Sequence, residues 1–143
     1  MATRCCDTPS LSPLIHLHKR GVPHGSPGHN VVHTYTDVSR CGSCGGGVVE
    51  HFSHDCWDPA DHSSWDMYWW WRVAPADMGV LLEVVASCPA PLDPSCTCPV
   101  HRALGGGTVP PTRARSTETP YEEAPVPGAR VRVEDGTPRW AAA

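Results

Sequence analysis

The sequence predicts a small α+β domain with a three-stranded antiparallel sheet, one helix and disordered termini. Five of the six tryptophans and six of the eight cysteines fall within residues 31–104 of the 143-residue chain. That segment contains three runs of β-branched and aromatic residues, followed by one run with helical spacing. A core of this size usually needs a disulfide or a metal ion to be stable.

The two ends of the chain differ from this segment in composition. Residues 1–30 hold four Pro, three Gly and four His, and residues 105–143 hold six Pro and five Gly. Such segments bury too little apolar surface to offset the entropy of the unfolded chain. We therefore expect a disordered N-terminal segment over 1–30, a domain over 31–104 and a disordered tail over 105–143. Whether residues 1–30 belong to the natural protein stays open.

The three expected strands cover residues 31–40, 48–54 and 65–73. The first two are rich in β-branched and aromatic residues and flank a glycine-rich turn. In the third, every second residue from Trp65 to Val73 is apolar, which predicts a face directed at the core.

One helix is expected over residues 75–87. Pro75 suits the first turn of a helix, where the missing N–H is not needed, and Asp77 favours the same end electrostatically. Pro89 cannot continue the helix. The apolar stripe that would pack on the sheet has the spacing i, i+3, i+4, i+7 and consists of Met78, Leu81, Leu82 and Val85.

The turn between the first two strands, residues 41–47, reads CGSCGGG. Cys41 and Cys44 can direct both sulfurs at one metal ion, and the glycines let backbone N–H groups turn toward the thiolates. Two further ligands are expected from the cysteines about forty residues later. The sequence predicts one structural zinc ion but leaves open which residues complete its site. Cys88, Cys96 and Cys98 rank equally, and His101 is expected to lie at the surface or behind a ligand.

Two strands joined by a CxxC turn resemble the first half of a zinc ribbon. The resemblance covers about residues 35–52 and depends on the CxxCGG knuckle. It implies a structural zinc site and does not imply a particular function.

The same CGSC sequence also resembles the dithiol of thioredoxin-like redox proteins. In those proteins the motif opens a helix whose N-terminus lowers the pKa of the first thiol. Here glycines and a strand follow the motif, which favours zinc. A second set of reactive residue types could hold a second metal ion or a nucleophile pair of Cys56 and His54, and consists of His51, His54, Asp55, Cys56, Asp58, Asp61 and His62. Catalysis there is disfavoured because a nucleophile needs an oriented base, and the spacing provides none.

Charge and composition restrict the partners and the compartment. Residues 31–104 carry three basic and nine acidic side chains, a formal net charge of 3 − 9 = −6, which would repel the phosphates of a nucleic acid. No secretory signal and no membrane-length apolar run is recognised. We expect a cytoplasmic protein, where clustered thiols indicate metal more than disulfides. Ten Arg against one Lys favours a bacterial source with GC-rich coding.

Five tryptophans are too many for a domain of this size to bury completely. We expect an exposed aromatic face made of Trp57, Tyr68, Trp70 and Arg72. The sequence therefore predicts a non-catalytic module, stabilised by structural zinc, that binds a protein partner through this face. The alternatives are a thiol-based redox or Cys/His enzyme and a nucleic-acid-binding zinc ribbon. The oligomeric state stays open.

Overall fold

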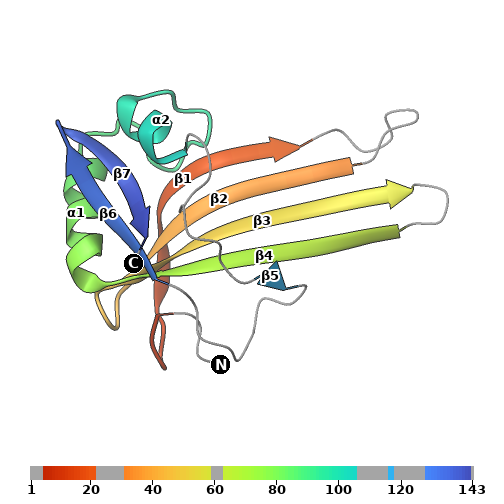
Figure 1. The fold of residues 1–143 in the computed structure, drawn as a ribbon, viewed down its shortest axis with the longest axis horizontal. Coiled ribbons are helices and arrows are strands. Elements are labelled where there is room, and N and C mark those ends of the chain that lie inside the picture. The colour runs from red at the N-terminus through yellow and green to blue at the C-terminus, as the bar shows by residue number, and fades with distance from the viewer. Residues whose placement is uncertain (1–4, 22–30, 59–62, 106–115, 118–127, 143) are drawn as a thin grey trace.

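The computed structural model describes residues 5–21, 31–58, 63–105, 116–117 and 128–142. Within these, side chains are not described at residues 19–21, 31–33, 54–58, 63–67, 116–117 and 142. The described residues form one mixed, curled sheet with two short helices at one end (Figure 1).

Four long strands form the main part of the sheet, each antiparallel to the next. They are β1 (Leu11–Gly21), β2 (Val31–Cys41), β3 (Gly47–Asp58) and β4 (Ser63–Val73). The register aligns apolar residues of successive strands. Val38 pairs with Ile15 on one side and with Val49 on the other, and Val49 pairs with Trp71.

Three shorter strands complete the sheet along the open edge of β4. They are β5 (Ser116–Thr117), β6 (Gly128–Glu134) and β7 (Thr137–Ala142). β6 runs parallel to β4 and pairs antiparallel with β7, so the strand order is β1-β2-β3-β4-β6-β7. β5 also pairs with β4, off this path.

The two helices are α1 (Pro75–Val85) and α2 (Pro99–Gly105). α1 begins with proline after an extended Ala74, as the sequence predicts. The carboxylate of Asp77, in its first turn, accepts the backbone N–H of Val131 at 2.9 Å, which ties the helix to β6. No helix among the described residues is long and apolar enough to cross a membrane.

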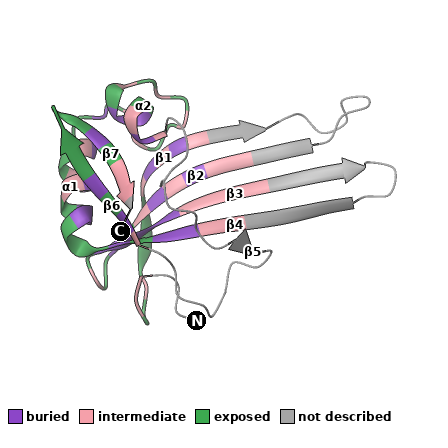
Figure 2. Cartoon of the chain, viewed as in Figure 1, coloured by how far each residue is buried: buried purple, intermediate pink, exposed green. Residues whose placement is uncertain are grey.

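The core lies at the helix end of the sheet, where the buried parts of the strands meet α1 (Figure 2). Met78, Leu81 and Val85 of α1 belong to the same buried cluster as Trp71 and Val73. Both helices and five of the strands contribute to it, through Ile15, Leu17, Val38, Val49, Trp71, Val73, Met78, Leu81, Val85, Cys88, Val100, Leu104, Ala129 and Val131.

The predicted three-stranded sheet with one helix and disordered termini is wrong. The three predicted strands and the helix are present as β2, β3, β4 and α1. However, β1, β6 and β7 arise from the end segments, and α2 follows the cysteine-rich loop. The pairing of β1 with β2 shifts register twice, between Pro13 and Ile15 and between His16 and His18. Among its described side chains only Ile15 and Leu17 are buried, so the alternation that would reveal a strand is short.

Close packing requires two of the glycines that follow Cys44, Gly46 and Gly47. A Cβ added at Gly47 would collide with the carbonyl oxygen of Ser39 and the terminal methyl of Met78.

We expect Gly47→Ala to destabilise the protein by about 1–3 kcal/mol, because overpacking forces backbone shifts. Gly79 in α1 has open space around it, so Gly79→Ala should stabilise the helix by up to about 1 kcal/mol. Denaturant unfolding of both variants checks this prediction, and equal effects would contradict the packing.

His51 gives the sheet a defined pH dependence. Its ring lies within 2.8 Å of the Thr36 hydroxyl and packs against Trp69, and burial and the nearby His18 lower its pKa below 6.5. The folded protein thus holds His51 neutral when the unfolded chain would charge it. Its contribution to stability is complete above the unfolded pKa and is lost as pH falls from 6.5 toward the lower folded value.

We expect the free energy of unfolding of the wild type to fall between pH 7.5 and pH 5.5 by more than that of His51→Gln. Denaturant titrations in excess zinc at both pH values measure this difference. An equal fall in the two proteins would show that His51 does not contribute.

Candidate metal centres

Two separate groups of side chains each bring four metal-ligating atoms to within 4.8 Å of one another. The first, which we call the loop group, consists of Cys88, Cys96, Cys98 and His101. The second, the turn group, consists of Cys5, Cys6, Cys41 and Cys44. Each group could hold a metal ion.

The loop group forms where α1 ends and α2 begins. Cys88 follows the last turn of α1, and its N–H donates to the carbonyl oxygen of Val85 at 2.9 Å. The proline-rich loop then turns back, with the N–H of Cys96 donating to the carbonyl oxygen of Asp93 at 3.1 Å. Cys98 precedes α2 and His101 lies in its first turn, so the helix places both on the same side.

His101 is the residue that closes the loop group. Its side chain is buried, with 3% exposed, and Nδ1 lies 3.2 Å from the Cys88 sulfur and 3.3 Å from the Cys98 sulfur. The other ring nitrogen, Nε2, lies 3.0 Å from the carbonyl oxygen of His16. A carbonyl can only accept, so this bond assigns the proton to Nε2 and leaves the Nδ1 lone pair facing the thiols. This is the usual arrangement of a metal-bound histidine.

The thiols of the loop group differ in acidity. Burial raises the pKa of Cys88 to about 11. Burial acts in the same direction on Cys98, but the backbone N–H of His101, which donates to the Cys98 sulfur at 3.4 Å, acts to lower its pKa. The thiolate is the form that binds metal, so this backbone donor favours the ligating form of Cys98.

The turn group assembles around the hairpin between β2 and β3. Cys41 ends β2 and Cys44 lies in the turn, where Gly45 adopts a positive φ of 80° that favours glycine. Because β1 runs antiparallel to β2, the residues before β1 return to this turn. The N–H of Gly42 donates to the carbonyl oxygen of Ser10 at 2.8 Å and fixes the approach.

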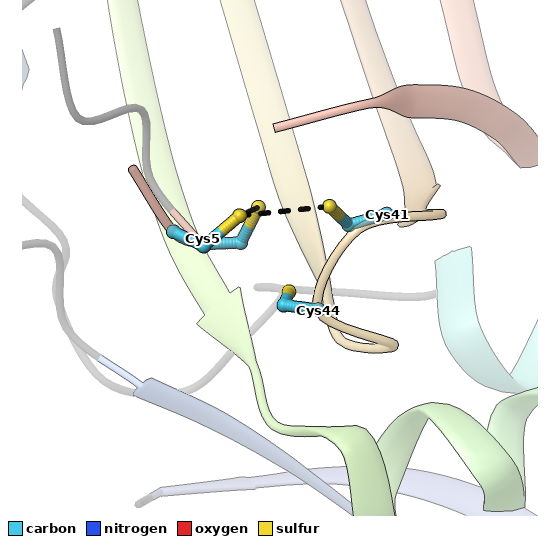
Figure 3. A group of neighbouring side chains, drawn as sticks. Cys5, Cys41 and Cys44 are labelled. Carbon is cyan, nitrogen blue, oxygen red and sulfur yellow. Dashed lines mark hydrogen bonds between the residues drawn. The ribbon is translucent and has the colours of Figure 1, made fainter. Parts of the chain in front are cut away.

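The thiols of the turn group converge beside the hairpin (Figure 3). The Cys6 sulfur lies 3.8 Å from the sulfurs of both Cys5 and Cys41. Cys41 is fully buried, and the backbone N–H of Ser10 donates to its sulfur at 3.4 Å. That bond, with backbone N–H groups of the turn, lowers the pKa of Cys41 to about 6, whereas burial raises the pKa of Cys5 and Cys6.

The donor sets of the two groups fit zinc. Cys₄ and Cys₃His are the usual ligand sets of structural zinc sites, which are four-coordinate and tetrahedral. All seven cysteines in the two groups are free thiols rather than disulfides. Four protein ligands would leave no position for water or substrate, so neither group has the open coordination of a catalytic zinc.

The five predicted ligands all fall in these groups, but the structure divides them. Cys41 and Cys44 lie in the turn group, whereas Cys88, Cys96 and Cys98 lie in the loop group. The partners of Cys41 and Cys44 are instead the cysteines of the N-terminal segment, which sequence reasoning missed. His101 was expected at the surface or behind a ligand, but it is buried among the thiols. Its CxxH spacing from Cys98 is the sequence signal that indicates a ligand pair.

The predicted aromatic face is only partly exposed. Trp70 is buried, with 3% exposed, and its ring N–H donates to the Glu50 carboxylate at 2.9 Å. Tyr68 stacks on Trp70 with ring centroids 5.5 Å apart, and Arg72 is exposed. Trp57 lies outside the residues whose side chains are described.

Glu50 supplies the polar partner of the buried Trp70. Its carboxylate also accepts the hydroxyl of Tyr35, whose pKa is raised by burial and by this negative charge. The sheet can therefore bury the polar nitrogen of Trp70 without leaving it unpaired. The predicted reactive set at His51, His54 and Cys56 is not assembled by the described side chains, since those of His54 and Cys56 lie outside them.

A cleft of about 340 Å³ lies beside the loop group. It runs between β1, β2 and the proline-rich loop, and His16 Nδ1 lies 2.6 Å from the Asp37 carboxylate there. The residues that line it are His16, His18, Tyr35, Asp37, Leu92 and Pro94.

Comparison with protein-family models, with curated proteins and with solved structures finds no match for this chain. The function is therefore inferred from the residues and geometry of the two groups.

Proposed function

We propose that this protein is a non-catalytic module that folds around structural zinc, with one zinc ion held by the loop group. The observation that carries the proposal is the orientation of His101. A buried imidazole whose Nε2–H is bonded to a backbone carbonyl directs Nδ1 at thiols 3.2 and 3.3 Å away. Such a second bond fixes the tautomer and direction of a metal-bound histidine.

Zinc at the loop group would join four parts of the fold. Cys88 belongs to the end of α1, Cys96 to the loop, and Cys98 and His101 to the start of α2. His101 also contacts β1 through its bond to the His16 carbonyl oxygen. The His16 N–H in turn donates to the Pro91 carbonyl oxygen at 2.8 Å, so the loop covers the outer edge of β1. Structural zinc sites contribute about 10–16 kcal/mol apparent free energy in small peptides, and that energy drives folding.

A thiol-based redox protein is the second candidate, and the low pKa of Cys41 and Cys98 favours it. Zinc explains more of the geometry, because a redox pair needs two thiols whereas each group gathers four ligands. Thiol titration of the zinc-loaded protein distinguishes the two. Slow labelling that becomes fast after chelation supports zinc, and fast labelling with zinc present supports redox chemistry.

A protein is the partner class that we propose for this module. The net charge of −6 over residues 31–104 opposes nucleic acid, and thiolate-bound zinc adds further negative charge. Trp70 is buried, whereas Tyr68 is half-buried and Arg72 is exposed, so contacts with a partner would involve Tyr68 and Arg72. A cytoplasmic location, where thiols stay reduced, is part of the same proposal.

Replacing a loop-group ligand tests the proposed function. We expect Cys98→Ser to lose one zinc ion per chain and to lower the melting temperature by 10 °C or more, since metal and fold are coupled (about 4 °C per kcal/mol in a domain of this size). Thr97→Ser, one residue away in the same loop, is the matched control and should retain both properties.

Elemental analysis after purification without added metal, with a thermal melt followed by tryptophan fluorescence, measures the effect. Wild-type protein that contains no zinc and melts cooperatively at the same temperature with and without a chelator would overturn the proposal.

A further inference from the structure

We infer that the turn group binds a second zinc ion, in an all-cysteine site that fastens the N-terminal segment to the hairpin between β2 and β3. This inference goes beyond the proposed function, which needs zinc only at the loop group. It depends on four side chains that share no ligand with the loop group.

Backbone hydrogen bonds already hold the CxxC turn in a conformation that a metal ion can bind. The N–H of Cys41 donates to the Gly46 carbonyl oxygen at 2.8 Å, and the N–H of Gly45 donates to the Cys41 carbonyl oxygen at 3.1 Å. These bonds close the CxxC turn and direct the sulfurs of Cys41 and Cys44 to the same side (Figure 3). The turn is therefore a formed zinc knuckle.

The N-terminal segment contacts this knuckle through hydrogen bonds of Ser10. Ser10 donates its N–H to the Cys41 sulfur at 3.4 Å and accepts the N–H of Gly42 at 2.8 Å. The pairing of β1 with β2 begins at the next residue, with Leu11 opposite Cys41. Cys5 and Cys6 are thereby placed as the third and fourth ligands, from a part of the chain 35 or more residues away in sequence.

The four sulfur ligands determine which metal ions the site can bind. The site offers four sulfurs and no carboxylate or imidazole among its ligands. Thiolates select soft or borderline ions such as Zn²⁺ and Cd²⁺ over Mg²⁺, Ca²⁺ and Mn²⁺. On binding, the thiols that are still protonated release their protons to solvent, and the site with Zn²⁺ carries a net charge of 4 × (−1) + 2 = −2.

Four thiols held close together without a metal would be a costly arrangement. Backbone N–H groups of Ser10 and Thr8 reach the sulfurs of Cys41 and Cys6, and the Cys6 sulfur also faces those of Cys5 and Cys41. A cation at their centre satisfies all four at once, and it explains why the chain brings two consecutive cysteines to a CxxC turn.

The test counts metal in variants of the full chain that each lose ligands from one group. Zinc per chain is measured by elemental analysis in the wild type, in Cys5→Ser/Cys6→Ser and in Cys98→Ser. Cys56→Ser, which replaces a cysteine that neither group includes, is the matched control. Hydrogen exchange at the Ser10 and Gly42 amides provides a readout beside metal content.

We expect two zinc ions in the wild type and in the control, and one in each of the other variants. Cys5→Ser/Cys6→Ser should keep the loop-group zinc and the cooperative melt of the core, while Ser10 and Gly42 lose at least tenfold of their protection. One zinc that Cys98→Ser removes and Cys5→Ser/Cys6→Ser retains would overturn the second site and leave the proposed function intact. One zinc that either variant abolishes would overturn it in favour of a single site with ligands from both groups.

Discussion

The pairing of β1 with β2 positions both groups of metal ligands. At its first residue, β1 lies opposite Cys41, so the cysteines just before it reach the CxxC turn. Farther along the same strand, the backbone of His16 bonds the proline-rich loop and the ring of His101 on its outer edge. One edge strand thus sets the composition of the turn group and orients the histidine of the loop group.

Metal binding at these two places suits the distribution of the core. The buried apolar residues gather at the end of the sheet where α1 and α2 lie, whereas β1–β4 extend well beyond it (Figure 2). The turn at Cys41–Cys44 and the loop from Cys88 to Cys98 are short of apolar side chains of their own. Zinc would supply there the stabilisation that a small domain cannot draw from hydrophobic burial alone.

Residue composition and apolar spacing in the sequence predicted three of the strands and one helix. β2, β3 and β4 follow β-branched and aromatic content, and α1 follows its proline start and apolar spacing. β1 escaped because its buried residues are few, Ile15 and Leu17, and Pro13 interrupts the run before them. β6 and β7 pair with each other across a tight turn at Asp135 and Gly136, a local signal that the glycine and proline content of residues 105–143 obscured.

The same reasoning explains the candidate sites. Cys41 and Cys44 carry a local motif and were predicted as ligands, as were the cysteines after α1, and all five fall in groups that could hold a metal ion. Their division into two groups follows from β1, so a sequence reading without that strand joins them into one site. Trp70 was expected to be exposed because strand alternation places it opposite the core face, but the half-buried Glu50 carboxylate on β3 gives its nitrogen a partner.

X-ray absorption at the zinc edge of the purified wild-type protein tests the central claim most directly, because it reports the atoms bound to the metal. Two filled sites would bind their two ions through 4 + 3 = 7 sulfurs and one nitrogen. We predict a first shell dominated by sulfur at about 2.3 Å, averaging three to four per zinc, with a minor nitrogen contribution at about 2.0–2.1 Å. A shell of mainly oxygen and nitrogen, or an open position occupied by water, would contradict closed structural sites at the two groups.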